Sequence, residues 1–251
     1  MRTVFSIFYW LVMVVYLVVY AVFITVVWAL TVPFDRRRVI LSYTTWGHAA
    51  MFFWLAPGWR IRVEGGENLD RKKACVMVSN HGAMFDIPTL HAALCLNVRW
   101  VAKHELLRMP FVGHALMIHG DIMIKRGEAS GTKTFFEKGR KNLANGVSVT
   151  LFPEGTRSKT GRVGNFKDGG FLLAKEAGVG ILPIVIDGTR DAFDGWRLRM
   201  PHTFRVRVLS EIPAGDVAET DVRTMRKRVR EQIAKALETM CPDRCPRGET
   251  T

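Results

Sequence analysis

Hydrophobic residues are distributed very unevenly along this chain of 251 residues. Between Thr3 and Phe34 there is no Asp, Glu, Lys, Arg or His, and the run from Val4 to Leu30 is apolar on every helical face. At about 1.5 Å per residue, such a helix is longer than the roughly 30 Å hydrocarbon core of a bilayer. The pattern predicts a transmembrane helix over about residues 4–31. A cleaved signal peptide, the alternative, has a shorter apolar run and a small-residue cleavage site.

A second apolar stretch, residues 39–55, is interrupted by small and polar side chains. We expect it to form an interfacial or re-entrant helix that holds the rest of the chain against the bilayer, with a full second span as the alternative. Arg36–Arg38 follow the first helix, whereas only Arg2 precedes it, so the positive-inside bias places its C-terminal side in the cytoplasm. Residues 1–57 are therefore predicted to anchor the protein in the inner (cytoplasmic) membrane, with the following domain on the cytoplasmic face.

After Pro57 the pattern becomes that of an α/β domain, predicted over residues 58–251. Short apolar, β-branched runs predict seven strands, at Trp59–Val63, Ala74–Ser79, Val98–Ala102, Asp121–Ile124, Val147–Phe152, Ile181–Ile186 and Phe204–Leu209. Helical patterns lie between most of them, at Ile87–Leu96, Phe111–Ile118, Gly131–Leu143 and Phe171–Ala177. This alternation is typical of a single domain with a largely parallel or mixed sheet flanked by helices. In such sheets ligands bind at the carboxyl ends of the strands.

Two further segments of the domain have distinct patterns. An amphipathic helix is predicted over about residues 221–240, with an apolar stripe that packs on the domain; contact with the membrane is the alternative. The interval Ser158–Gly170 is rich in glycine and basic residues. We expect it to be too polar to pack and to form a mobile flap.

The charge balance narrows the partners without selecting one. The 36 Lys and Arg residues against 23 Asp and Glu give a net charge of +13, which suits anionic lipid headgroups, phosphorylated substrates or nucleic acid equally well. The four cysteines have no framework spacing, so in the cytoplasm we expect free thiols. Cys241 and Cys245 have no second Cys/His pair near them, and no metal site is predicted.

The residues most suited to acid–base chemistry follow the second predicted strand. His81 comes directly after it, and Asp86 stands five positions later at an expected helix start. A carboxylate that accepts from one ring nitrogen leaves the other nitrogen as a proton acceptor and stabilises the imidazolium formed later. The spacing predicts a general base with an orienting group; a capping Asp beside an unrelated loop His is the alternative.

A second candidate site begins where the predicted strand 147–152 ends, in the sequence Phe-Pro-Glu-Gly-Thr-Arg-Ser. Pro and Gly force a turn, so backbone N–H groups, the Thr156 hydroxyl and the Arg157 guanidinium can converge on an anion. Glu154 is unusual in an anion site. It could accept from a substrate hydroxyl, hold Arg157, or be a solvated turn residue.

Together these segments resemble the glycerolipid acyltransferase family, and most closely the 1-acyl-sn-glycerol-3-phosphate (lysophosphatidic acid) acyltransferases of bacterial membranes. Asn80, His81 and Asp86 match its Asn-His-x4-Asp motif, and residues 152–158 match its Phe-Pro-Glu-Gly-Thr-Arg-Ser motif unchanged. Two intervening segments match as well, through Lys103, Glu105, Leu106, Pro110, Gly113, Gly120, Ile122, Ile124 and Arg126. Residues 181–185 match a further apolar block with a central proline. Lys125 departs from the many relatives that have an acidic residue there, which leaves the acceptor headgroup open.

The resemblance implies transfer of a fatty acyl group from acyl-CoA or acyl carrier protein to the sn-2 hydroxyl of 1-acyl-glycerol-3-phosphate, giving phosphatidic acid. His81 would be the general base and Asp86 its orienting group, with no covalent intermediate and no cofactor. The substrate-binding residues would be Asn80, Lys103, Arg126, Glu154, Gly155, Thr156 and Arg157, of which the lysine and the arginines would clamp the phosphate. The implied partners are these substrates and the lipid bilayer, and nucleic acid is not among them.

Two other functions stay open, and two further enzyme classes are disfavoured by motifs that the sequence lacks. An acyltransferase for a lyso-ornithine lipid or another lysophospholipid remains an alternative. A non-enzymatic, membrane-tethered basic protein is a more distant one, and it predicts that binding survives loss of His81. The chain contains no Gly-x-Ser-x-Gly and no Gly-x-Gly-x-x-Gly after a predicted strand, which disfavours a serine hydrolase and a dinucleotide enzyme.

Overall fold

The computed structural model of the chain describes residues 2–240. Its helices are α1 (Arg2–Thr31), α2 (Val39–Trp54), α3 (Asp86–Leu94), α4 (Val112–His119), α5 (Ala129–Ala144), α6 (Gly169–Ala177), α7 (Ala214–Glu219) and α8 (Val222–Met240), with 3-10 turns at η1 (Gly66–Asn68) and η2 (His104–Arg108). Its strands are β1 (Trp59–Glu64), β2 (Val76–Ser79), β3 (Val98–Lys103), β4 (Ile122–Ile124), β5 (Ser148–Leu151), β6 (Ile181–Asp187), β7 (Phe193–Asp194), β8 (Arg197–Leu198) and β9 (His202–Val208).

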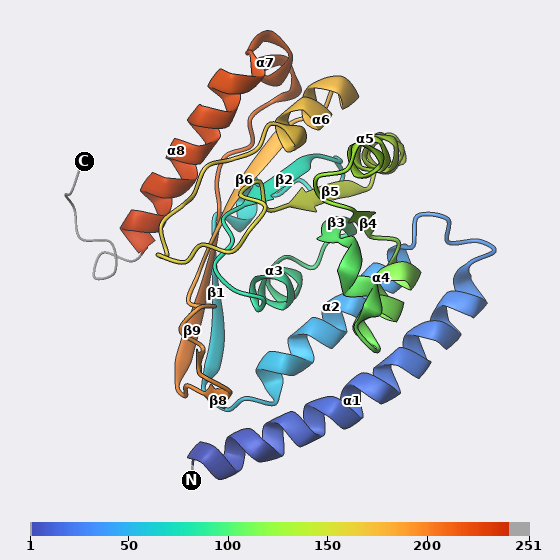
Figure 1. Cartoon of the computed structure of the whole chain (residues 1–251), viewed down its shortest axis with the longest axis vertical. Helices are drawn as coiled ribbons and strands as arrows, with labels where there is room; N and C mark the ends of the chain where they lie inside the picture. Colours follow the sequence, from blue (N-terminus) through green and yellow to red (C-terminus); the bar gives the residue numbers. More distant parts are fainter. Residues whose placement is uncertain (1, 241–251) are drawn as a thin grey trace.

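Seven strands form one mixed sheet in the order β1-β9-β6-β2-β5-β3-β4 (Figure 1). The five strands from β6 to β4 are parallel, whereas β9 pairs antiparallel with β6 and parallel with β1. Each predicted strand is present, with ends displaced by two residues or fewer. The expected α/β fold with about seven strands is confirmed. The hairpin β7–β8 and the short helix α7 were not predicted.

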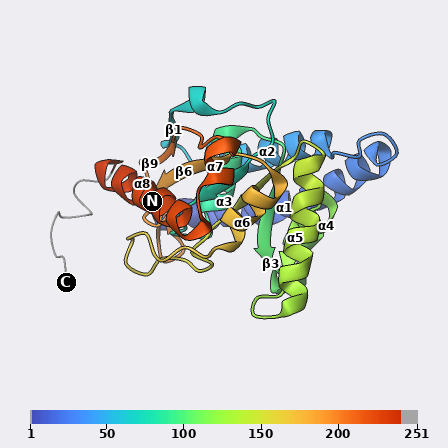
Figure 2. The ribbon, with the colours of Figure 1, turned by 90° about the horizontal axis from the view of Figure 1, so that it is seen from above.

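Alternating side chains of the buried strands point into two cores. Val76 and Val78 of β2 face the helices α5, α6 and α8, whereas Met77 faces α3. In Figure 1 the sheet separates α5, α6 and α8 from α3, α2 and α1, and Figure 2 shows α8 and α5 at opposite ends of their layer. The predicted stripe of the C-terminal helix packs in this layer through Met225, Val229, Ile233 and Leu237, so its packing on the domain is confirmed.

Helix α1 lies along the domain. Its first turn is tied to the β7–β8 hairpin, where Nε of Arg2 donates to the Leu198 carbonyl (2.7 Å) and the Leu198 N–H donates to Ser6 (3.1 Å). Near its other end, the Thr25 hydroxyl lies 2.7 Å from Nε2 of His114 in α4. One face of α1 is buried, and the other exposes an apolar stripe: Val4, Ile7, Phe8, Leu11, Val14, Val15, Val18, Val19, Val22, Phe23, Val26 and Leu30.

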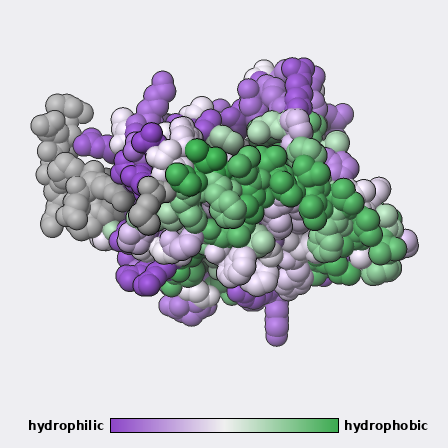
Figure 3. Space-filling view, turned by 90° about the horizontal axis from the view of Figure 1, so that it is seen from below, coloured by the Kyte–Doolittle hydropathy of each residue, from purple (hydrophilic) through white to green (hydrophobic). Residues whose placement is uncertain are grey.

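This exposed stripe forms a band of apolar surface in Figure 3. A band of this size on a water-soluble surface is rare, and α1 is the one described helix long and apolar enough to cross a membrane. The N-terminal element therefore associates with a membrane. The full span over residues 4–31 and the interfacial placement of residues 39–55 stay predictions.

The expectation of a mobile flap at Ser158–Gly170 is wrong. Val163 and Phe166 of this segment are buried in the core beside α6 and α8. Arg230 of α8 donates to the carbonyls of Val163 (3.1 Å) and Gly164 (2.8 Å). Two apolar side chains were enough to dock a segment whose composition is otherwise polar.

Cysteine chemistry plays no visible part in the described fold. Cys75 is buried and Cys95 half-buried, and both are free thiols. Residues 2–240 contain no group of three or more His, Cys, Asp and Glu arranged to hold a metal ion. Cys241 and Cys245 lie outside the described residues.

Candidate active site

The candidate residues meet at the carboxyl edge of the five parallel strands. His81 follows β2, the segment 152–158 follows β5, Lys103 ends β3 and Arg126 follows β4. Parallel strands end at the same edge of a sheet, so segments that are far apart in the sequence become neighbours there. The structure therefore brings together the two motifs that the sequence places about 70 residues apart.

His81 and Asp86 form a close imidazole–carboxylate pair. Nδ1 of His81 lies 2.6 Å from Oδ2 of Asp86, a carboxylate that is fully buried. The same Oδ2 accepts the backbone N–H groups of Gly82 (2.7 Å) and Ala83 (3.0 Å), and Oδ1 accepts the Thr189 hydroxyl. A carboxylate surrounded by donors is an acceptor only, so the ring proton sits on Nδ1. Asp86 is the first residue of α3, and its side chain turns back into the loop instead of capping the helix.

The ring of His81 is held flat and keeps its other nitrogen open. It stacks on Phe152 with the ring centroids 4.0 Å apart and the planes 10° apart. No hydrogen bond from residues 2–240 reaches Nε2, and the side chain is 17% exposed. Nε2 can therefore accept a proton from a group that approaches along this edge.

Glu154 joins the two motifs instead of facing solvent. Its Oε1 accepts the His81 N–H (2.9 Å) and its Oε2 accepts the Gly164 N–H (2.8 Å). Burial raises the pKa of the Glu154 carboxyl above its ordinary value, and the two N–H groups oppose this shift. The Ser158 N–H donates to the His81 carbonyl (2.8 Å), which makes a second link. The contacts of Glu154 in the structure are thus those of a positioning residue, and its predicted contact with substrate stays a prediction.

Asn80 also makes backbone contacts. Its side chain donates to the Ile186 carbonyl and accepts the Ile186 N–H, both at 2.9 Å, so it continues the pairing between β2 and β6 beyond Ser79. Only 7% of the residue is exposed. This arrangement fixes where His81 leaves the sheet.

Cationic side chains gather around the turn at Gly155. Arg126 donates to the Gly155 carbonyl, and a Cβ on Gly155 would lie 3.0 Å from Cε and 3.1 Å from Nζ of Lys167. Arg157 is exposed and makes no hydrogen bond or ion pair with the described residues. It immediately precedes Ser158, which is bonded to His81, so its backbone is on the side of the base. Lys103 lies at the same edge, where its ammonium pairs with Glu105 (3.0 Å).

This geometry suits deprotonation of a hydroxyl group beside an anion. The imidazole has one nitrogen committed to a buried carboxylate and one free, which is the arrangement of a general base with an orienting partner. The exposed cations of Arg126, Arg157 and Lys167 come from three segments that meet around the adjoining turn, where they can contact a phosphate. Gly155 has a positive φ of 72°, so a side chain there would strain the backbone and crowd Lys167.

Comparison with known proteins identifies the family of the chain. The family model described as Acyltransferase matches residues 60–187, which is more than half of the chain. The chain belongs to the acyltransferase family. It is 32% identical to the 1-acyl-sn-glycerol-3-phosphate acyltransferase of Borreliella burgdorferi over 74% of this chain and 75% of that protein, and 30% identical to that of Pseudomonas aeruginosa over 84% and 81%.

Relatives of other sizes and a solved structure extend the comparison. The chain spans less than half of two chloroplast relatives, from Arabidopsis thaliana (34% identity, 43% of that protein) and Brassica napus (33%, 45%). Its fold is similar to the crystal structure of the 1-acyl-sn-glycerophosphate acyltransferase from Thermotoga maritima, with a TM-score of 0.80 at 24% identity over 99% of this chain and 98% of that one. The likeness in fold thus includes α1 and α2, which precede the part matched by the acyltransferase family.

Two residues of the site escaped the sequence reasoning. Thr189 is 3% exposed and binds Asp86, and it lies two residues beyond the matched part of the family. Its place after β6, at the same sheet edge as His81, is a signal that could have been used. Lys167 lies within a segment interpreted as a flap, and no pattern in the sequence links it to Gly155.

Proposed function

We propose that this chain transfers a fatty acyl group from a thioester donor to the sn-2 hydroxyl of 1-acyl-glycerol-3-phosphate. The observation that carries the proposal is the 2.6 Å contact between His81 and Asp86 beside the cations of the Gly155 turn. Nε2 of His81 takes the hydroxyl proton, and the oxygen attacks the thioester carbonyl. The C–S bond then breaks, and the imidazolium returns its proton to the thiolate. Asp86 stabilises the imidazolium throughout.

The acceptor's phosphate is matched to the charges of the site. Arg126 and Arg157 supply planar guanidinium groups that bind phosphate with two parallel hydrogen bonds, and Lys167 and Lys103 add point charges. Lys167 joins the proposed clamp because of its place beside Gly155. Asn80 and Glu154 support the clamp by fixing the loops that carry it.

The location of the reaction follows from the nature of the substrates. The acceptor and the product remain in the bilayer, whereas the donor, acyl-CoA or acyl carrier protein, is dissolved in the cytoplasm. We place the apolar stripe of α1 in the lipid and the catalytic domain on the cytoplasmic face of the inner membrane. The Arg36–Arg38 cluster at the end of α1 supports this orientation because basic residues favour the cytoplasmic side.

The test is an acyl-transfer assay on the full chain in detergent. Two donors with a labelled acyl group, acyl-CoA and acylated acyl carrier protein, are each offered with lysophosphatidic acid or with a neutral lysolipid. The variant His81→Ala is assayed beside the wild type. We expect product only with the phosphate-bearing acceptor, and a loss of at least a thousandfold in kcat for His81→Ala. Equal turnover of both acceptors refutes phosphate recognition, and an active His81→Ala refutes the general base.

A different lysolipid acceptor is the second candidate, and Lys125 is the residue that favours it. Its ammonium lies 3.8 Å from the Glu128 carboxylate, so charges of both signs meet at this end of β4. A lyso-ornithine lipid or another lysophospholipid in the same assay distinguishes the acceptors. Turnover of either one above that of lysophosphatidic acid assigns the chain to that acceptor.

A further inference from the structure

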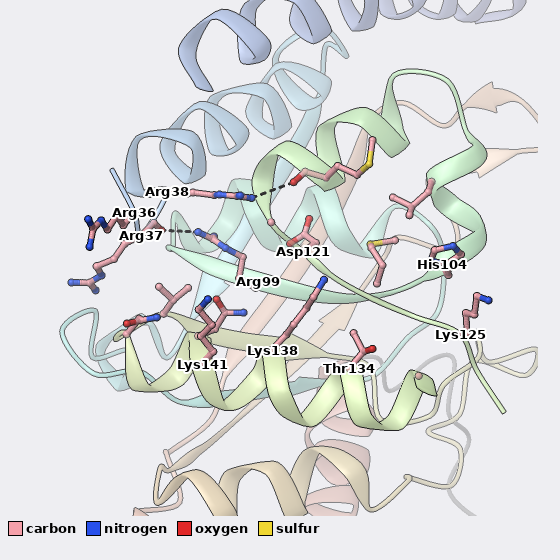
Figure 4. Close-up of a pocket in the computed structure, with 18 of the residues that line it drawn as sticks. Arg36, Arg37, Arg38, Arg99, His104, Asp121, Lys125, Thr134, Lys138 and Lys141 are labelled. Carbon is pink, nitrogen blue, oxygen red and sulfur yellow. Dashed lines mark hydrogen bonds between the residues drawn. The ribbon is translucent and has the colours of Figure 1, made fainter. Parts of the chain in front are cut away.

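A cavity of about 780 Å³ lies beside the candidate active site, between α5 and the β4 edge of the sheet. We call it the α5 groove. Seven Lys and Arg side chains line it, from four parts of the chain (Figure 4). Arg36–Arg38 come from the loop after α1, Arg99 from β3, Lys125 from the end of β4, and Lys138 and Lys141 from α5. Cavities of this size hold extended small molecules.

Most of the positive charge of the α5 groove is uncompensated, since Lys125, which lies 3.8 Å from the exposed Glu128, is the one lining cation that forms an ion pair with a described residue. The one carboxylate in its lining, Asp121, is buried and accepts from His119 (2.9 Å) and from the Trp100 N–H (2.8 Å). Lys138 and Lys141 form no ion pair with any described residue. Like charges around one concave space repel each other unless an anion enters it. The groove is therefore built for a ligand with several negative charges.

The arginines at its far end are held in place without being neutralised. Arg37 donates to the Gly146 carbonyl (2.9 Å), and Arg38 donates to the Ile118 carbonyl (2.7 Å). Arg99 in turn donates to the Arg37 carbonyl (2.6 Å). A carbonyl partner orients a guanidinium and leaves its full charge, so this end of the groove is a preorganised anion site.

The groove is long, and one end of it lies next to Lys103 and Arg126 of the candidate active site. Its α5 side is a stripe from Ser130 to Asn145 that includes Thr134 and Asn142, and it runs for about 22 Å at the rise of a helix. Lys125, at the near end, is the neighbour of Arg126. The order β2-β5-β3-β4 puts β4 three strand spacings, or about 14 Å, from the strand that carries the base.

We propose that the α5 groove binds the phosphorylated nucleotide end of a coenzyme A donor, an inference that rests on the proposed function. Coenzyme A carries a diphosphate and a 3′-phosphate, together about four negative charges. Its pantetheine arm has a backbone equivalent to about four amino-acid residues, which spans about 15 Å when extended. The arm thus reaches from the thioester at His81 to Lys125 at the near end of the groove, and the phosphates and the nucleoside beyond the arm extend along α5 toward Lys138 and Lys141.

The shape of the groove favours this ligand over a carrier protein or a lipid surface. A Cβ on Gly131 would lie 2.0 Å from the Lys125 carbonyl oxygen, so the start of α5 packs directly on the end of β4 and bounds the groove there. A helix of an acidic carrier protein is about 10–12 Å wide and does not enter a recess that narrows to such a contact. The apolar stripe of α1, which we place in the lipid, is a separate surface, since none of its residues lines the groove.

The test compares a charge deletion in the groove with a matched deletion outside it. Lys138→Ala/Lys141→Ala removes two groove charges, and Lys133→Ala/Lys227→Ala removes two charges that are each 78% exposed elsewhere. Each variant is assayed with three acyl donors: acyl-CoA, acyl-pantetheine, which lacks the nucleotide, and acylated acyl carrier protein. We expect the groove variant to raise KM for acyl-CoA about tenfold, and the control to leave it within twofold. Adenosine 3′,5′-bisphosphate should compete with acyl-CoA for the wild type and weakly for the groove variant.

Each other outcome has a definite meaning. If the groove variant raises KM for acyl carrier protein and leaves that for acyl-CoA unchanged, the groove recognises the carrier and the proposal is wrong. If it weakens binding to vesicles with anionic lipid and changes neither KM, the groove contacts the membrane, and the proposal is again wrong. If the protein uses acylated acyl carrier protein and does not use acyl-CoA, the proposed coenzyme A site is wrong, while the proposed acyl transfer survives. If no donor is turned over, it is the proposed function that fails.

Discussion

Replacing Asp86 by Asn separates the charge of this carboxylate from its hydrogen bonds. Oδ2 accepts from the His81 ring and from the N–H groups of Gly82 and Ala83, so the carbonyl oxygen of Asn must take this position. The amide nitrogen then faces the Thr189 hydroxyl, which can rotate and accept. Each contact of the wild type keeps a partner, and the variant should fold.

The variant loses the stabilisation of the imidazolium that forms when His81 takes the hydroxyl proton. Two charges at 2.6 Å, one of them fully buried, interact strongly because little solvent screens them. An orienting carboxylate of this kind contributes about 10²–10⁴-fold to kcat, which corresponds to about 3–5 kcal/mol in the barrier. KM for either substrate should change little, since Asp86 touches neither of them.

The measurement is steady-state kcat and KM at pH 7 with acyl-CoA and lysophosphatidic acid, together with a thermal melt. Asp216→Asn is the matched control: it makes the same chemical change on α7, at an exposed side chain 3.9 Å from Arg228. It should keep kcat within twofold. A fall of less than fivefold in kcat for a correctly folded Asp86→Asn would refute the assignment of Asp86 as the partner of the base.

Two further predictions concern stability, measured by denaturation in detergent. Gly131→Ala should lower the free energy of unfolding by about 1–3 kcal/mol because the new Cβ meets the Lys125 carbonyl oxygen. The control is Gly215→Ala, which has open space around the new Cβ and should be neutral or stabilising. A Gly131→Ala variant that is more stable than the wild type contradicts this packing. Burial lowers the pKa of His91 to about 3, so its neutral form stabilises the fold at neutral pH and this contribution is lost as the pH falls below about 6.5. Between pH 7 and pH 5 the wild type should lose about 2 kcal/mol more than His91→Gln, and equal losses would show that His91 is protonated in the folded state.

The sheet and the ends of its strands could be predicted from the sequence because buried parallel strands have a recognisable apolar composition. The residues of β2 and β5 are buried on both faces, so each strand appears as a short run without charged residues, rich in Val, Met and Leu. The polar residues that follow such a run lie at the carboxyl edge of the sheet, which is how His81 and Arg157 could be placed together. The family motif then added the pairing of His81 with Asp86, which spacing alone left open.

The surroundings of these residues could not be predicted, because they depend on side chains from unrelated parts of the chain. In the sequence Glu154 looks like a solvated turn residue, and its two backbone contacts become visible only when the loops at His81 and Gly164 are folded. Lys138 looks like an ordinary solvated helix position. Its neighbours across the α5 groove, Arg37 and Arg99, are 101 and 39 residues earlier.

The orientation of α1 shows most clearly where sequence reasoning ends. A helix on a protein surface is normally oriented by the contrast between its apolar and polar faces, and α1 has no such contrast. Tyr9 and Met13 are buried against the domain, whereas Leu11 and Val15 are exposed, although all four are of the kind expected in a lipid-contacting helix. Length and hydropathy alone therefore predict a helix that crosses the bilayer. The contacts of Arg2 with the β8 strand and of Thr25 with α4 set its direction along the domain and decide which of its apolar faces is buried.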